Sequence, residues 1–140
     1  EFVEKLIKVN IEIEESLIIW FNSDSLKNIF INLISNSLDA IGNNGGYITI
    51  SGQYIKNNTI KIEITDNGTG FANSRKERIF EPFYTLKTSK KNLGIGLWLV
   101  KNEIEKYSGR IIADCNKDKK ITKFTLLLNG KKDTIPSERN

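Results

Sequence analysis

The sequence predicts a two-layer α/β sandwich of the α+β class, in which a mixed sheet of about five strands is backed by about three helices. The chain of 140 residues is long enough for one hydrophobic core. Two segments repeat apolar residues at the 3.6-residue period of an α-helix. The segments with the two-residue period of a strand come in pairs joined by short turns. Because hairpins alternate with the helices, a doubly wound parallel sheet is disfavoured.

The predicted helices span residues 24–41 and about 94–107. Asparagine and serine side chains can cap the first helix, and the glycine-rich residues 42–46 end it. Gly109 stands just past the second helix, where a glycine commonly ends a helix. The first helix carries one apolar stripe, formed by Leu26, Ile29, Phe30, Leu33, Ile34, Leu38 and Ile41.

The predicted strands form two hairpins, at residues 47–54 with 59–66 and at residues 110–115 with 121–128. Residues 1–20 are interpreted as a short amphipathic start that leads into an extended piece at residues 17–21. One short helix is expected near residues 74–80, within a long irregular stretch. We expect one domain over residues 1–130, with its core at residues 17–128, and a disordered polar tail at residues 131–140.

The composition excludes several classes of function. The chain has no histidine, so it holds neither a histidine general base nor a phospho-accepting histidine. Its single cysteine excludes an intrachain disulfide and disfavours zinc chemistry. The net charge of +4 is not gathered into one block, and no apolar run is long enough to span a membrane. We therefore expect a cytoplasmic domain without direct nucleic-acid or membrane contact, within a parent protein that can itself be membrane-anchored.

The first polar signal is a row of side chains that flanks the apolar stripe of the helix at residues 24–41. It consists of Asn28, Asn32, Ser35, Asn36 and Asp39. Asn32 and Asn36 are one helical turn apart, so their amides point the same way. A row of oxygen donors suits a hard cation such as Mg2+. A solvated polar face is the alternative interpretation.

The second signal is the segment Asp66-Asn67-Gly68-Thr69-Gly70-Phe71 at the end of a predicted strand. Asp66 shares a strand face with three isoleucines and so points toward the core, where a carboxylate needs hydrogen-bond partners. Gly68 and Gly70 allow close approach to the backbone or a positive φ. An inward acid beside bare backbone suits a ligand that donates hydrogen bonds, such as the amino group of adenine. The alternative is a turn in which Asp66 bonds local amides.

The third signal is a segment rich in lysine and glycine that leads into the second helix. Lys87, Lys90 and Lys91 precede Gly94 and Gly96. Free N–H groups and the helix dipole make such a helix N-terminus a site for anions, although neither a dinucleotide-binding motif nor a Walker A sequence is present. A capped helix after a basic loop is the alternative. A weaker signal is the inward-facing Thr122, whose hydroxyl needs a partner. A hydrogen bond from this hydroxyl to a backbone carbonyl is the commoner alternative.

Taken in order, these segments resemble the N, G1, F and G2 boxes of sensor histidine kinases. The matching segments are Asn36 in its helix, Asp66-Asn67-Gly68-Thr69-Gly70, Ile79-Phe80-Glu81-Pro82-Phe83-Tyr84-Thr85 and Gly94-Ile95-Gly96-Leu97. The resemblance covers roughly residues 17–128. It implies the Bergerat fold, shared with gyrase-type, chaperone and mismatch-repair ATPases, with ATP held between the helices under a mobile lid.

The resemblance also implies roles for single residues. Asn36 corresponds to the Mg2+ ligand, Asn32 to its partner near the phosphates and Lys87 to the lid residue that reaches the phosphates, which makes these three the expected catalytic residues. Asp66 corresponds to the aspartate that bonds the adenine amino group. The other expected ATP-binding residues are Gly68, Gly70, Phe80, Gly94, Gly96, Leu97 and Thr122.

A sensor kinase transfers the γ-phosphoryl group of ATP to a histidine on a dimerisation domain, and its downstream partner is the receiver domain of a response regulator. Both domains are implied as partners of this chain. The alternatives are an ATPase of the same fold, an anti-sigma-type serine kinase and a non-catalytic nucleotide-binding module. Hydrolysing members carry a glutamate where this chain has Asn32, which disfavours the ATPase. The chain also departs from the common pattern at Asp39, where many members carry lysine or arginine, and at Trp98, where glycine is frequent.

Overall fold

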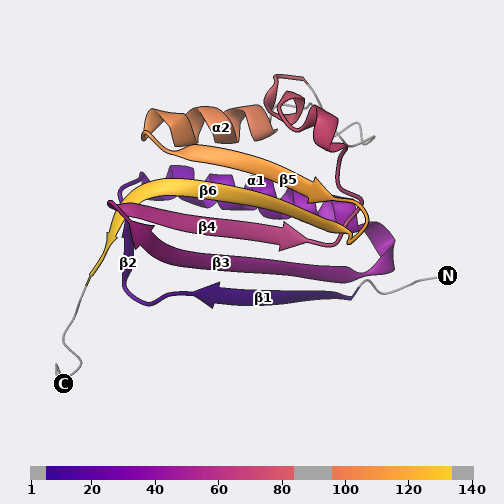
Figure 1. The fold of residues 1–140 in the computed structure, drawn as a ribbon, viewed down its shortest axis with the longest axis horizontal. Helices are drawn as coiled ribbons and strands as arrows, with labels where there is room; N and C mark the ends of the chain where they lie inside the picture. Colours follow the sequence, from indigo (N-terminus) through magenta and orange to yellow (C-terminus); the bar gives the residue numbers. More distant parts are fainter. Residues whose placement is uncertain (1–5, 84–95, 134–140) are drawn as a thin grey trace.

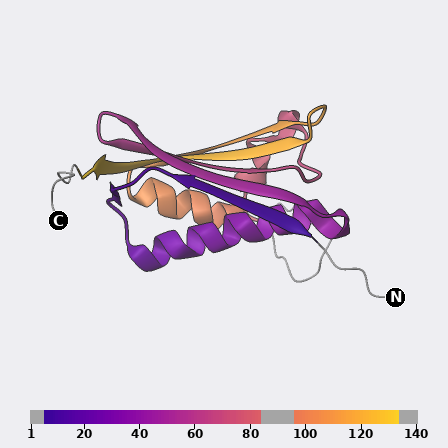
Figure 2. The ribbon, with the colours of Figure 1, turned by 90° about the horizontal axis from the view of Figure 1, so that it is seen from below.

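The computed structural model describes residues 6–83 and 96–133, and it shows one mixed sheet with two α-helices on the same face (Figures 1 and 2). Helix α1 spans Ser23–Ile41 and helix α2 spans Gly96–Lys106. The predicted two-layer sandwich is confirmed, with six strands in the described ranges where about five were expected. No helix within these ranges is long and apolar enough to cross a lipid bilayer.

The strands are β1 (Ile7–Ile13), β2 (Leu17–Ile19), β3 (Gly46–Lys56), β4 (Thr59–Asp66), β5 (Arg110–Asn116) and β6 (Ile121–Lys132). Across the sheet they follow the order β1-β3-β4-β6, and β5 and β2 pair with successive parts of β6. Within the described residues β1 and β3 are parallel and the other pairs are antiparallel. The sheet is therefore mixed, as predicted.

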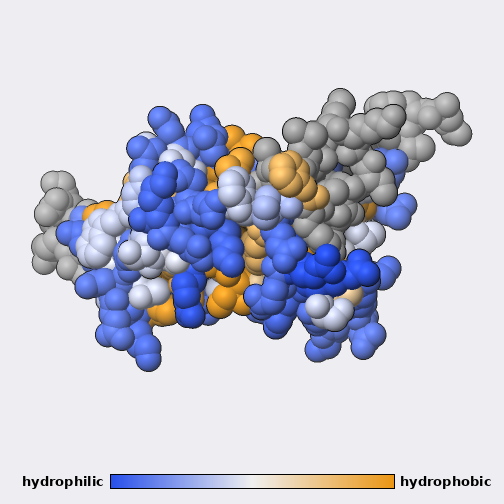
Figure 3. All heavy atoms as spheres, turned by 90° about the horizontal axis from the view of Figure 1, so that it is seen from above, coloured by the Kyte–Doolittle hydropathy of each residue, from blue (hydrophilic) through white to orange (hydrophobic). Residues whose placement is uncertain are grey.

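Strand alternation decides which face of the sheet carries the core. On β4 and β6 every second side chain is buried beneath the helices, while lysine, glutamate and threonine occupy much of the opposite face. Helix α1 adds Ile29, Leu33 and Ile41 to this core, and α2 adds Val100 and Ile104. Hydrophilic side chains cover much of the surface on the α2 side, with apolar atoms across its middle (Figure 3).

Local signals in the sequence fix the bounds of α1. The Asn22 side chain caps the helix by accepting a hydrogen bond of 2.9 Å from the Ser25 N–H. Gly42 ends the helix with a φ of 69°, a conformation that glycine adopts at little cost. The hairpin between β3 and β4 turns at Asn57 and Asn58, which both have positive φ, as a two-residue turn requires.

The structure corrects four details of the sequence interpretation. Part of the amphipathic start is a regular strand, β1, that pairs with β3. The disordered tail was expected to begin at residue 131, but β6 continues to Lys132 and pairs there with β2. The expected short helix is two 3-10 turns, η2 (Asn73–Arg75) and η3 (Arg78–Phe80). Gly109 was expected to end α2, but the residue with positive φ at this helix end is Ser108, with a φ of 63°.

Candidate nucleotide-binding site

Asp66 lies at the end of β4, in a row of side chains that crosses the helix-facing side of the sheet. Strand register places Ile48 on one side of Asp66 and Thr122 on the other, with Cys115 beyond Thr122. Asp66 is 2% exposed and Thr122 is 4% exposed. Sequence alternation predicted this inward orientation for both, and the structure confirms it. Two polar groups thus share one buried place in the core.

Ser37 of α1 is the third polar group at this place. It is 1% exposed, and its hydroxyl makes no hydrogen bond of good geometry within the described residues. Burial raises the pKa of Asp66 above its ordinary value of 3.8, while the Gly68 N–H and the nearby Ser37 hydroxyl act to lower it. A buried carboxyl and an unsatisfied hydroxyl together suit a ligand that donates a hydrogen bond, such as an adenine amino group.

The two glycines after Asp66 bring the backbone against its neighbours. The Gly68 N–H donates a 2.8 Å hydrogen bond to Asp66 Oδ1, and a Cβ at Gly68 would lie 2.6 Å from the Ala40 carbonyl carbon. Gly70 has a φ of 70°, and a Cβ there would collide with Cys115 Sγ and approach Thr122 Oγ1 to 2.9 Å. Glycine at residue 70 therefore keeps open the space over Thr122.

Asn32 and Gly96 come together at the start of α2. A Cβ at Gly96 would lie 3.2 Å from Asn32 Oδ1, so the Asn32 side chain reaches the backbone of the helix N-terminus. The Asn32 Nδ2 donates a 3.1 Å hydrogen bond to the Asn28 carbonyl, which orients the Asn32 amide. Asn36 lies one turn further along α1 and is half-buried. The structure thus brings Asn32 of the asparagine row to the start of α2, the helix N-terminus that was expected to suit an anion.

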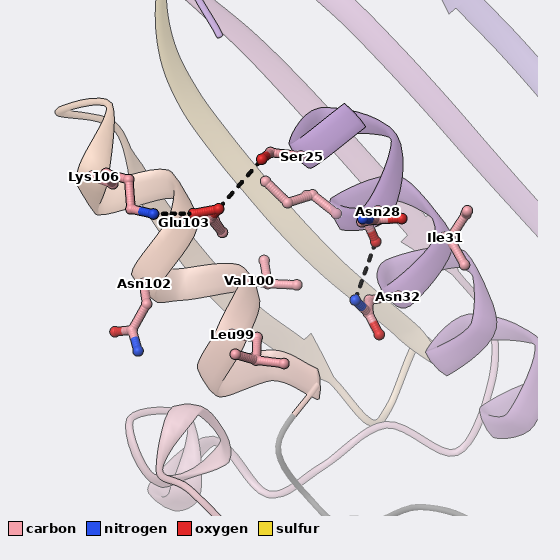
Figure 4. A pocket seen from close by; sticks show the side chains of 10 residues that line it. Ser25, Asn28, Ile31, Asn32, Leu99, Val100, Asn102, Glu103 and Lys106 are labelled. Carbon is pink, nitrogen blue, oxygen red and sulfur yellow. Dashed lines mark hydrogen bonds and ion pairs between the residues drawn. The ribbon is translucent and has the colours of Figure 1, made fainter. Parts of the chain in front are cut away.

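A groove of about 510 Å3 continues beyond Asn32 between α1 and α2 (Figure 4). Among the expected site residues that the structure describes, only Asn32 lines this groove. The rest of its wall comes from neighbouring residues of both helices, including Asn28, Ile31, Leu99 and Glu103. Ser25 Oγ lies 3.3 Å from Glu103 Oε1, which links the two helices across the groove. The buried polar groups around Asp66, the asparagine row and the groove therefore follow one another along α1.

The remaining expected residues are only partly brought to this site. Phe80 is buried with its ring edge against Phe124 at a centroid distance of 6.4 Å, and Leu97 packs against the core. Their contact with a nucleotide stays a prediction. Lys87 and Gly94 lie outside the described residues.

Sequence reasoning missed Ser37, Cys115 and Asn73 as parts of the site. Ser37 lies four residues from both Leu33 and Ile41, so it is on the same helix face as these two apolar residues, but it was not named among the candidate residues. Cys115 lies beside Thr122, with its Sγ 3.7 Å from Thr122 Oγ1. Asn73 holds the loop after Gly70 against β5 by two hydrogen bonds to the backbone of Cys115. No local pattern marked Asn73, because its partner is 42 residues away.

Substituting Gly70 with alanine is expected to weaken ATP binding at least ten-fold and to destabilise the fold by about 1–2 kcal/mol. The added methyl group meets Cys115 and Thr122, and residue 70 keeps its positive φ. Gly42→Ala is the matched control, since Gly42 has a similar φ of 69° and nothing within 4 Å of the added Cβ. Calorimetric titration checks both variants. Equal ATP affinity in Gly70→Ala and Gly42→Ala would exclude a nucleotide from the space over Thr122.

Comparison with known proteins identifies the family of this chain. Residues 21–132 match the family described as histidine kinase-, DNA gyrase B- and HSP90-like ATPase. Sporulation kinase B of Bacillus subtilis (strain 168) is 37% identical over 107 residues, which are 76% of this chain and 24% of that protein. Sensor histidine kinase ZraS of Klebsiella oxytoca is 32% identical over 108 residues, 76% of this chain and 23% of that protein. The chain spans about a quarter of the length of these curated relatives.

Solved structures show the same fold. The catalytic domain of histidine kinase ThkA has a TM-score of 0.76 at 26% sequence identity, over 88% of this chain and 78% of that one. The mycobacterial sensor histidine kinase MprB has a TM-score of 0.81 at 21% identity, over 91% of this chain and 84% of that one. The family predicted from the four boxes is confirmed. The chain therefore belongs to the histidine kinase-, DNA gyrase B- and HSP90-like ATPase family, as an ATP-binding catalytic domain of the sensor histidine kinase type.

Proposed function

We propose that this domain binds Mg-ATP along α1 and donates the γ-phosphoryl group to a histidine of a separate dimerisation domain. The observation that carries the proposal is the arrangement along this one helix. Ser37 meets the buried Asp66 near the C-terminal half of α1, and Asn32 meets Gly96 at the start of α2. An adenine ring beside Asp66 and phosphates beside Asn32 would use both contacts.

The residues of this chain divide the work between binding and positioning. Asp66 accepts a hydrogen bond from the adenine amino group, and Thr122 lies beside the adenine ring. Asn36 would hold Mg2+, while Asn32 and the backbone at Gly96 would hold the phosphates. The described residues contain no group of three or more acidic, histidine or cysteine side chains that could hold a metal ion. An amide oxygen such as that of Asn36 can serve as one protein ligand for Mg2+, beside phosphate and water oxygens. When bound, Mg2+ supplies positive charge that offsets the charge of the transferring phosphoryl group.

The phosphoryl acceptor is proposed to approach through the groove between α1 and α2. The groove opens beyond Asn32 and so lies past the phosphate end of the site. A neutral imidazole nitrogen attacks the γ-phosphorus as the bond to the bridging oxygen breaks, and ADP leaves with the electron pair of that bond. The proton on the second ring nitrogen then passes to solvent. Because the imidazole is already a nucleophile, the chain needs no general base. Lys87 is proposed to offset charge on the phosphates.

Partners follow from the same proposal. The curated relatives are named as sensor and sporulation kinases and are about four times as long as the matching region. We infer that the parent protein supplies the histidine-containing dimerisation domain and that a receiver domain of a response regulator takes the phosphoryl group next.

The test is incubation of this domain with γ-labelled ATP, with and without the dimerisation domain of its own kinase. The domain by itself is expected to gain no acid-labile label, because it has no histidine. Adding the dimerisation domain is expected to place acid-labile, alkali-stable label on that domain, and a covalent tether is expected to raise the rate. Acid-stable label on this chain would instead indicate a serine or threonine kinase. Fast phosphate release without label would indicate an ATPase.

A further inference from the structure

Strand β1 forms an edge of the sheet, where its outer backbone groups have no strand partner within residues 6–83 and 96–133. Among the described strands it pairs only with β3 (Figures 1 and 2). The Leu6 carbonyl accepts from the Gly46 N–H, and the Glu14 N–H donates to the Gly52 carbonyl. Along a strand, alternate residues direct their N–H and C=O to opposite edges. Even-numbered residues therefore bond to β3, and the free edge carries the N–H and C=O groups of Ile7, Val9, Ile11 and Ile13.

Three of these odd-numbered residues, Val9, Ile11 and Ile13, form an exposed apolar stripe. Register with β3 places Val9 beside Ile48 and Ile11 beside Ile50, on the helix-facing side of the sheet. Val9 is 56% exposed, Ile11 62% and Ile13 55%, because α1 does not cover them. A regular strand with free hydrogen-bonding groups and an exposed apolar stripe is a site for adding another strand.

The opposite face of β1 carries charges in a symmetric pattern. Lys8 and Glu12 are exposed and equidistant from Asn10, the central residue of the strand. No ion pair involves Lys8 or Glu12 within residues 6–83 and 96–133. Two antiparallel copies of this strand, centred on Asn10, would place each lysine opposite the glutamate of the other copy. The charge pattern of β1 is therefore complementary to itself.

We infer that β1 is a self-association surface, which pairs antiparallel with β1 of a second copy of this chain about a twofold axis at Asn10. In this register Val9 faces Ile11 and Ile7 faces Ile13 of the other copy. These residues are the ones whose backbone groups point to the free edge, so each forms a hydrogen-bonded pair. Lys8 and Glu12 then face each other in non-hydrogen-bonded pairs, where side chains are closest.

Other registers satisfy fewer groups. A shift by one residue would direct backbone groups that are already bonded to β3 toward the partner strand. A shift by two residues places Asn10 opposite a charged residue and shortens the pairing. The self-complementary register is therefore the one in which all seven residues of β1 contribute. Because a pair of seven-residue strands is small for an interface, the dimer is expected to be weak and dependent on protein concentration.

The test is sedimentation velocity on the full 140-residue chain over a range of concentrations. The wild type is expected to dimerise reversibly at high concentration. Lys8→Glu and Glu12→Lys each place like charges opposite each other and are expected to weaken the dimer roughly ten- to thirty-fold. An equimolar mixture of the two variants restores opposite charges and is expected to associate, as is the double variant. ATP affinity of each variant serves as the control for folding, because neither residue belongs to the nucleotide site.

Two results would overturn the inference. One is a wild type that stays monomeric at about 1 mM, a concentration at which weak transient interfaces are populated. The other is a dimer whose strength does not respond to either charge reversal, since such a dimer would use a different surface. Neither result bears on the nucleotide site, which the ATP titrations test separately.

Discussion

Asp66→Asn is expected to weaken ATP binding roughly ten- to a hundred-fold, which is the loss expected when a charged hydrogen-bond partner is replaced by a neutral one. The asparagine keeps an oxygen that can accept the Gly68 N–H but offers an amino group to the adenine side. Asp118→Asn is the control for the same chemical change, because Asp118 is exposed in the turn between β5 and β6. Calorimetric titration of both variants checks the expectation. Wild-type affinity in Asp66→Asn would remove Asp66 from the site.

The same substitution is expected to raise stability at neutral pH. Burial raises the pKa of Asp66, so the folded state holds this proton more tightly than the unfolded state does. The resulting stability is present below the ordinary pKa of 3.8 and is lost as pH rises through the folded-state pKa. Thermal unfolding should therefore show a higher midpoint for Asp66→Asn than for wild type at neutral pH, with a gap that narrows toward acid pH. A gap that widens toward acid pH would contradict this account.

Asn36→Ala is expected to remove the Mg2+ dependence of ATP binding and to slow phosphoryl transfer on the order of 100-fold. Asn36 is half-buried one helical turn after Asn32, and it is the proposed metal ligand. The fold should persist, because alanine stabilises a helix by up to about 0.7 kcal/mol relative to asparagine. The measurement is ATP affinity with Mg2+ and with a chelator, together with label transfer to the dimerisation domain.

Ser35→Ala is the matched control for Asn36→Ala, since Ser35 is the preceding residue of α1 and is exposed. It should retain wild-type Mg2+ dependence and transfer rate. If Asn36→Ala also retains the Mg2+ dependence, another group holds the metal. A loss of adenine binding equal to the loss of Mg2+ binding would indicate a general disruption of α1.

The elements that sequence predicted well are those whose signals are local. The bounds of α1 follow from Asn22, Gly42 and the apolar stripe, and the inward orientation of Asp66 follows from alternation along β4. Gly70 was singled out for conformational freedom, and the structure shows a positive φ there. These features needed no knowledge of the partner elements.

Some of the features that were missed depend on contacts between residues far apart in the chain. Another had a local pattern that was interpreted too broadly. β1 alternates between apolar and polar residues without a break, yet it was taken only as an amphipathic start. The end of β6 is polar and glycine-containing, and its strand structure depends on pairing with β2. Ser37 was hidden among apolar residues, because periodicity places a side chain on a face and does not reveal which polar group lies opposite it.

The most direct measurement of the central claim is calorimetric titration of the wild-type domain with ATP, ADP and GTP in the presence of Mg2+. Asp66 accepts a hydrogen bond from the adenine amino group, whereas guanine presents a carbonyl oxygen in its place. We predict that ATP and ADP bind and that GTP binds at least ten-fold more weakly, a difference of about 1.4 kcal/mol or more. Equal affinities for ATP and GTP would contradict adenine recognition by the buried cluster of Asp66, Ser37 and Thr122.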